Sequence, residues 1–168
     1  AVRHNRTERV FTANEAPPTA CIPFHHEMAQ CDESPDVIAF YCATPAAVNG
    51  STPFVLSRDV ARHVIEAHPH AARELRTRGI QYVRTLPMED DPSSPIGRSW
   101  KTSFKVLAKR ECDNVLAASS SVFDWEWLGD DLRTVSVARD VFGQDTLGRP
   151  TFFNSAVAAR RGWSDTRN

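Results

Sequence analysis

The chain lacks any apolar run that approaches the length of a membrane-spanning helix, and no secretory signal opens it. It also lacks an excess of charge of either sign. A formal net charge of -1 gives no general electrostatic attraction to nucleic acid or to an anionic membrane. We therefore expect a cytoplasmic globular protein whose 41% hydrophobic residues build one core, with no nucleic acid and no membrane as partner.

The four cysteines lack the spacing of a disulfide scaffold or of a paired metal motif. Cys21, Cys31, Cys42 and Cys112 include no Cys-x-x-Cys pair, so we expect reduced thiols in an intracellular protein. A zinc site is an alternative, because two of these cysteines flank a pair of histidines. Its four ligands would be Cys21, His25, His26 and Cys31, but their spacing matches no standard zinc motif.

Short strands separated by turn residues dominate the pattern of apolar residues, with one helical section among them. The helical section begins at Ser57, its predicted N-cap, is interrupted by Pro69 and ends at Gly79. The expected strands are 37–42, buried on both faces, 52–56, 80–84, a hairpin within 123–138, and 151–154. With no internal repeat and no second domain, residues 1–168 are predicted to form a single domain. Its fold is mainly β with α insertions, a sandwich or jelly roll.

The stretch from Ile22 to Gln30 carries the chemically most informative residues, His25, His26 and Glu27. In an extended segment successive side chains alternate between faces, so His25 and Glu27 point one way and His26 the other. An imidazole nitrogen and a carboxylate oxygen then face a common point, as two of the three ligands do in a 2-His-1-carboxylate iron site. A His-x-acid pair also arises by chance about once in a chain of this composition. Taken alone, the pair favours an ordinary surface turn.

Six segments add information through their order, although none of them is specific alone. They are Phe24-His25-His26-Glu27, the strand 37–42, Asn49-Gly50-Ser51-Thr52-Pro53, the helix-strand unit ending Tyr82-Val83-Arg84, Ser99-Trp100-Lys101-Thr102-Ser103-Phe104, and Phe152-Phe153-Asn154. Together they resemble the TauD/TfdA-like family of dioxygenases, and most closely its clavaminate synthase-like branch. Members of that branch have nearly the same His-His-Glu-Met-Ala and Asp-Asp-Pro-Ser-Ser-Pro-Ile-Gly-Arg stretches. The resemblance spans nearly the whole chain.

The resemblance implies a double-stranded β-helix, which is a form of jelly roll. It also implies an oxygenase that uses Fe(II), 2-oxoglutarate and O₂ to hydroxylate a small molecule. Within that family His25 and Glu27 match the first two iron ligands, with Glu27 standing where many members have Asp. Thr52 matches the threonine that helps to bind the carboxylate of 2-oxoglutarate, a role that suits a hydroxyl donor. Ser51 departs from the acid that is common in the preceding turn.

Two other sets of residues have both a functional and a structural interpretation. The side chains of Trp100, Phe104 and Asn154 would line the cavity of such an enzyme, but buried aromatic side chains also suit ordinary core packing. The remaining histidines of the helical section are expected to be solvated or capping residues, because no acid lies at a matching spacing; they are His63, His68 and His70.

The resemblance places two further parts of the site in a segment that this sequence does not contain. They are a third iron ligand, a histidine, and the arginine that binds 2-oxoglutarate. No histidine follows Asn154, the family's first strands lie upstream, and the chain does not begin with Met. We therefore expect an incomplete jelly roll and the central part of a longer enzyme. The alternative is a truncated, catalytically inactive paralogue that acts as a binding or structural protein.

Overall fold

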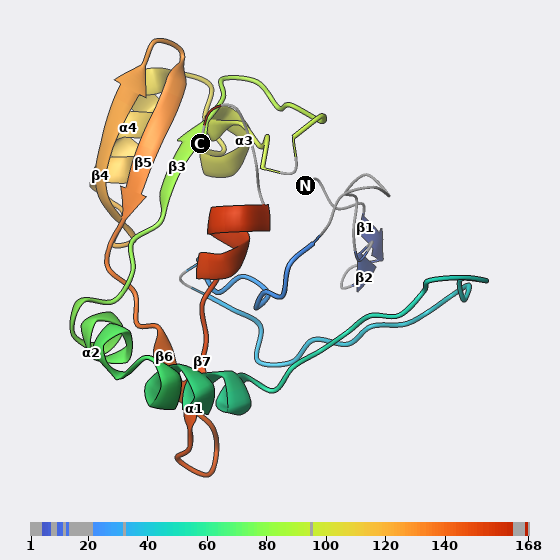
Figure 1. The fold of residues 1–168 in the computed structure, drawn as a ribbon. Coiled ribbons are helices and arrows are strands. Elements are labelled where there is room, and N and C mark those ends of the chain that lie inside the picture. The colour runs from blue at the N-terminus through green and yellow to red at the C-terminus, as the bar shows by residue number, and fades with distance from the viewer. Residues whose placement is uncertain are drawn as a thin grey trace. The chain divides into compact units, whose positions relative to one another are not determined.

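The structure is a computed structural model that describes residues 5–7, 10–11, 13, 22–31, 33–94, 96–162 and 167 (Figure 1). Contacts between residues divide the chain into two compact units that interleave along the sequence. The first unit takes its residues from 1–23, 81–139 and 156–168, and the second from 24–80 and 140–155. Each unit therefore joins segments that lie far apart in sequence.

Two helices of the second unit meet at Pro69, as predicted. Helix α1 spans Ser57–Ala67 and helix α2 spans Pro69–Arg78, with the proline in the first turn of α2, where its missing N–H costs nothing. Gly79 ends α2 with a φ of 66°, a conformation that glycine adopts without strain. The buried residues of the two helices are Ala61 and Ala72.

Ser57 is not the N-cap of α1, because Leu56 occupies that position. The Ser57 hydroxyl instead donates a hydrogen bond of 2.7 Å to the carbonyl of Phe152. Phe152 ends strand β7 (Pro150–Phe152), which pairs antiparallel with β6 (Phe142–Gln144). The start of α1 is thus attached to a hairpin strand 95 residues further along the chain.

The hairpin turn between β6 and β7 is stabilised by one carboxylate. Oδ1 of Asp145 accepts hydrogen bonds from the backbone N–H groups of Leu147 and Arg149, and Oδ2 lies 2.7 Å from Nε of Arg149. These bonds stabilise the charged form, the backbone bond from Arg149 contributing most, and hold the pKa of Asp145 below its ordinary value. Glycine at position 148, with a φ of 73°, completes the turn.

The first unit contains a three-stranded antiparallel sheet in the order β3-β5-β4. Its strands are β3 (Val83–Leu86), β4 (Val122–Leu128) and β5 (Asp131–Ser136). The predicted hairpin is confirmed, because β4 and β5 pair directly around Gly129, which has a φ of 62°. A register shift between Val122 and Asp124 interrupts the expected alternation in β4, and Phe123 is exposed. A separate pair, β1 (Asn5–Thr7) and β2 (Val10–Phe11), belongs to the same unit.

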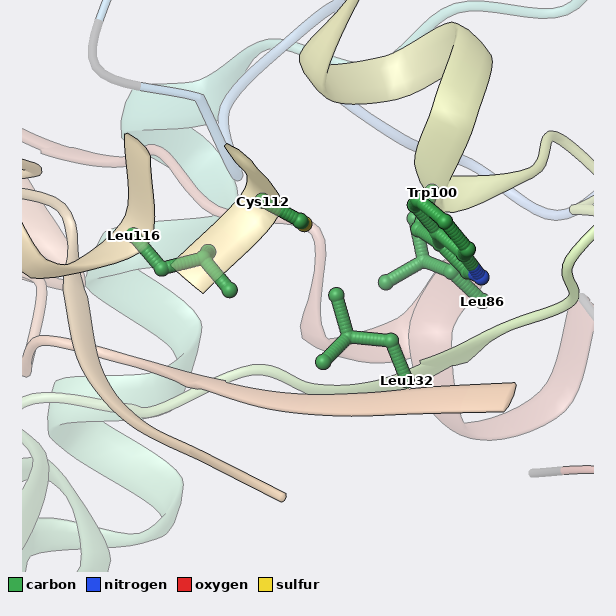
Figure 2. Packing of buried hydrophobic residues seen from close by; sticks show 5 residues of the cluster. All are labelled: Leu86, Trp100, Cys112, Leu116 and Leu132. Atoms are coloured by element: carbon green, nitrogen blue, oxygen red, sulfur yellow. The ribbon is translucent and has the colours of Figure 1, made fainter. Parts of the chain in front are cut away.

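One face of this sheet covers the core of the unit, together with α3 (Trp100–Phe104) and α4 (Lys109–Ala117). The buried cluster consists of Leu86, Trp100, Cys112, Leu116 and Leu132 (Figure 2). The buried indole N–H of Trp100 still has a hydrogen-bond acceptor, because it donates to the carbonyl of Asp130 at 3.0 Å. After strand β7 the chain closes with a π-helical turn, η1 (Ala158–Gly162).

Two strand predictions are wrong. Residues 37–42 and 52–56 were expected to be strands, the first buried on both faces. In the structure neither segment has a ladder partner among the described residues, and both are exposed along their whole length. Apolar, β-branched composition favours a strand only where another strand supplies hydrogen bonds and cover.

The fold of the described residues is therefore mixed α/β with small antiparallel sheets rather than mainly β. The two sheets of a jelly roll are not clearly formed by this part of the chain, because its strands are short and the segments 37–42 and 52–56 remain outside any ladder. No helix among the described residues is long and apolar enough to cross a membrane.

Asp113 offers a test of the packing of α4 on the sheet. Its Oδ1 accepts hydrogen bonds of 2.9 Å from the indole N–H groups of both Trp125 and Trp127. Because Asp113→Ala leaves two half-buried donors without this acceptor, the free energy of unfolding should fall by about 2 kcal/mol. Asp113→Asn, which keeps an acceptor oxygen, should lower the free energy of unfolding by less.

Urea denaturation followed by tryptophan fluorescence measures this change. The control is Asn114→Ala, an exposed position on the same helix that should change stability little. Equal losses for Asp113→Ala and Asn114→Ala would contradict the assigned role of Asp113.

Cys112 should resist thiol reagents in the folded protein. Its side chain is fully buried, and this burial, with a smaller contribution from the charge of Asp113, raises the pKa of the thiol to about 11. Pulse alkylation at pH 8 followed by peptide mass spectrometry should label the exposed Cys42 and spare Cys112 until urea unfolds the chain. Labelling of both at one rate would show that the core around Cys112 is open.

Candidate functional site

His25 and Glu27 lie close together on one side of an irregular segment of the second unit. The backbone from Ile22 to His26 has no regular hydrogen bonding and then enters a turn at Glu27. Nε2 of His25 is 3.9 Å from Oε2 of Glu27, and the two side chains are 36% and 22% exposed. A distance of 3.9 Å is too long for a hydrogen bond. The pair therefore presents two donor atoms to a common, solvent-accessible point.

His26 points elsewhere. Its ring lies 4.8 Å from the ring of Phe153, and its Nδ1 is 3.3 Å from the carbonyl oxygen of Asn154. Because a carbonyl only accepts, this hydrogen bond requires the proton on Nδ1. The alternation expected of an extended segment is thus present in the directions of these three side chains, although the segment is not a strand.

A second contact attaches the same turn to the chain after β7. The hydroxyl of Ser155 lies 2.9 Å from Oε1 of Gln30 and 3.4 Å from the carbonyl of His26. Asn154 and Ser155 are both buried, with 5% and 1% of their surface exposed. Their contacts hold His26 in place and thereby orient its neighbours His25 and Glu27. No sequence signal could have paired these residues, because more than 120 positions separate them.

The turn itself is tight. Met28 has a φ of 59°, in the left-handed region that non-glycine residues seldom adopt, and its carbonyl accepts a 2.8 Å hydrogen bond from the N–H of Cys31. This closure ends the extended run directly after Glu27. The Glu27 side chain therefore stays beside His25 rather than continuing along a strand.

The donor set fits a divalent metal in type and nearly in distance. Adjacent ligands of a six-coordinate ion with bonds of roughly 2.1 Å lie about 3 Å apart. The His25 and Glu27 donor atoms are 3.9 Å apart and would have to move closer together to bind one ion. Rotation of the side chains can provide that movement. No group of three or more His, Cys, Asp or Glu side chains suited to a metal occurs among the described residues.

The other residues predicted for the site are distributed differently. Thr52 lies in the exposed, irregular segment before α1. Trp100 is a core residue of the first unit with 1% of its surface exposed, and Phe104 packs against the same cluster. The structural interpretation therefore holds for both aromatic side chains. Asn154 contacts His26 instead.

One of the four ligands of the alternative zinc site, Cys21, lies outside the described residues. Cys31, Cys42 and Cys112 are thiols in the structure. Among the helical histidines, His63 and His68 face each other edge to face with ring centroids 6.3 Å apart, and both are exposed. This arrangement agrees with solvated histidines rather than with ligands.

The second unit also has an open hollow beside the β6-β7 hairpin. It is lined by Arg76, Phe142, Gly143, Gln144 and Pro150. The guanidinium of Arg76 lies over the ring of Phe142, 5.1 Å from its centroid. None of His25, Glu27 and Thr52 lines this hollow, so it has no link to the candidate site.

Comparison with known proteins identifies the class of protein to which this chain belongs. Residues 2–163 match the family described as Taurine catabolism dioxygenase TauD, TfdA family. The chain belongs to this family.

Two curated relatives cover most or all of the chain. It is 40% identical to the clavaminate synthase-like protein At3g21360 of Arabidopsis thaliana over 168 residues, which is 100% of this chain and 51% of the relative. It is 28% identical to the dapdiamide synthesis protein DdaC of Enterobacter agglomerans over 147 residues, 88% of this chain and 41% of the relative. The chain thus spans about half the length of the curated relatives it matches.

Ser155→Ala should loosen the turn that carries His25 and Glu27. The substitution removes the hydroxyl that contacts Gln30 and His26, at an expected cost of about 1 kcal/mol. Hydrogen exchange read by mass spectrometry should show faster exchange in 24–30 and no change in β4 and β5. Ser51→Ala, at an exposed position, serves as control. Unchanged exchange in 24–30 would mean that Ser155 does not anchor the turn.

Proposed function

We propose that this chain supplies the iron-binding part of an Fe(II)- and 2-oxoglutarate-dependent dioxygenase that hydroxylates a small molecule. The observation that carries the proposal is the pair His25 and Glu27, whose donor atoms face each other at 3.9 Å while His26 is held away by Asn154. Membership of the TauD/TfdA family supports the assignment. An imidazole and a carboxylate are two of the three ligands by which non-haem oxygenases hold Fe(II).

In this proposal His25 and Glu27 each supply one donor atom to the metal. Thr52, through its hydroxyl, orients the carboxylate of 2-oxoglutarate. Iron, when bound together with 2-oxoglutarate and O₂, supplies the oxidising chemistry, and the chain positions it and shapes the site. Binding requires the imidazole nitrogen without its proton and the carboxylate in its charged form.

The support for the two ligands comes from the second unit alone. His26, Asn154 and Ser155 fix the backbone on which the ligands are carried. Residues that position metal ligands in this way matter for affinity as well as for stability. The substrate is proposed only as a small molecule, since the identity of the substrate depends on pocket residues rather than on the fold.

Removal of either ligand should weaken the metal affinity of the chain. In an anaerobic titration with Fe(II), His25→Ala and Glu27→Gln should each weaken binding about tenfold or more relative to the unaltered chain. His63→Ala, which removes an exposed histidine of α1, is the matched control and should bind as the unaltered chain does. The assignment is wrong if His25→Ala binds Fe(II) as tightly as His63→Ala.

Activity is tested in a form of the protein extended to the length of its relatives. With Fe(II), O₂ and 2-oxoglutarate this form should release succinate, and the His25→Ala variant should not. Absence of iron-dependent turnover in a protein that still binds Fe(II) would favour the alternative, a binding or structural protein without catalysis.

A further inference from the structure

Three consecutive residues after β7 contact the turn that carries the proposed ligands. The ring of Phe153 lies 4.8 Å from that of His26, and the carbonyl of Asn154 accepts the hydrogen bond from Nδ1 of the same imidazole. The hydroxyl of Ser155 donates a 2.9 Å hydrogen bond to Oε1 of Gln30. The position of the turn therefore depends on where the backbone of this short segment lies.

Two hydrogen bonds hold the beginning of this segment. The backbone N–H of Phe153 donates a 2.9 Å bond to the carbonyl of Val141, which extends the β6-β7 pairing by one residue. The carbonyl of Phe152 accepts the 2.7 Å hydrogen bond from the Ser57 hydroxyl. The first bond belongs to the hairpin itself, whereas the second comes from α1, which lies beside β7 (Figure 1). Through Ser57, α1 thus fixes the backbone immediately before the contacts with the ligand turn.

The Ser57 hydroxyl makes this contact instead of capping its own helix. The N-cap is Leu56, whose side chain has no polar group, and Ser57 is the first residue of α1. The 2.7 Å bond has the most common length for a hydroxyl donor, and the Ser57 side chain is half-buried. Away from bulk water such a bond is stronger than at the surface, and loss of its donor is more costly.

We propose that Ser57 is a positioning residue for the metal site. It supplies no donor atom to the metal and acts through β7, because its hydrogen bond fixes the carbonyl of Phe152 and the next three residues hold the ligand turn. Residues that orient metal ligands from a distance in this way influence metal affinity. The identity of the ligands, His25 and Glu27, rests on the proposed function, whereas the contacts themselves do not involve the metal.

Anaerobic titration with Fe(II) alone measures the effect on the ligands. Ser57→Ala should weaken binding about fivefold, the size of effect expected for one hydrogen bond, and Ser57→Thr, which keeps a hydroxyl, should restore it. Thr77→Ala is the matched control, because the Thr77 hydroxyl donates to the carbonyl groups of Arg73 and Glu74 in its own helix. This control should bind Fe(II) as the unaltered chain does.

Two results of the titration would overturn the proposal. If Ser57→Ala binds Fe(II) as tightly as the unaltered chain, Ser57 has a structural role only, even where the variant unfolds at a lower urea concentration. If Ser57→Ala and Ser57→Thr weaken binding equally, the hydroxyl is not the cause of the effect. An unaltered chain that binds Fe(II) no more tightly than His25→Ala contradicts the proposed function instead, and the role of Ser57 is then decided by a measurement without iron.

Hydrogen exchange without added metal is that measurement. Ser57→Ala should speed the exchange of amides in 24–30 about fivefold, because the segment that holds the ligand turn detaches more often. Ser57→Thr and Thr77→Ala should leave exchange in 24–30 as it is in the unaltered chain. Unchanged exchange in β4 and β5 would show that the first unit stays folded in every variant. Exchange in 24–30 that is the same in Ser57→Ala and the unaltered chain overturns the proposal, whatever the outcome with iron.

Discussion

The contacts that Asn154 and Ser155 make with the turn at His26 are the interaction on which the candidate site depends. They join the end of β7 to a segment near the beginning of the described chain, and they fix His26 on the side away from His25 and Glu27. The hydroxyl of Ser57 in turn attaches the start of α1 to β7. These polar contacts between distant segments thus hold the backbone that carries the two proposed ligands, in a unit whose buried apolar side chains among the described residues are small.

The two units differ in how they are stabilised. In the first unit a sheet and two helices enclose Leu86, Trp100, Leu116 and Leu132. The indole N–H groups of the half-buried Trp125 and Trp127 donate to the carboxylate of Asp113. Burial of apolar surface is the main favourable term there. In the second unit many of the large apolar residues lie between Val37 and Leu56, where they are exposed. Among the described residues, the unit that carries the proposed ligands thus buries fewer large apolar side chains than the first unit does.

Local features were predictable because they depend on a few adjacent residues. Pro69 separates two helices, Gly129 turns a hairpin, and side chains two apart in 25–27 point the same way, as backbone geometry requires. The prediction of strands at 37–42 and 52–56 failed for the opposite reason. Their composition shows that these segments are suited to burial, but a strand forms only where a partner supplies the other half of the ladder.

The sequence by itself therefore determined the chemical identity of the candidate ligands, the breaks between elements and the family. Only the tertiary structure decided which residues support those ligands, that Ser57 bonds to β7 instead of capping its helix, and that Trp100 belongs to a core. Sterics and hydrogen bonding within a few residues act in any context, so they can be inferred from sequence. The partners of His26 and Asp113 depend on how separate segments pack together, and that packing has no local signature.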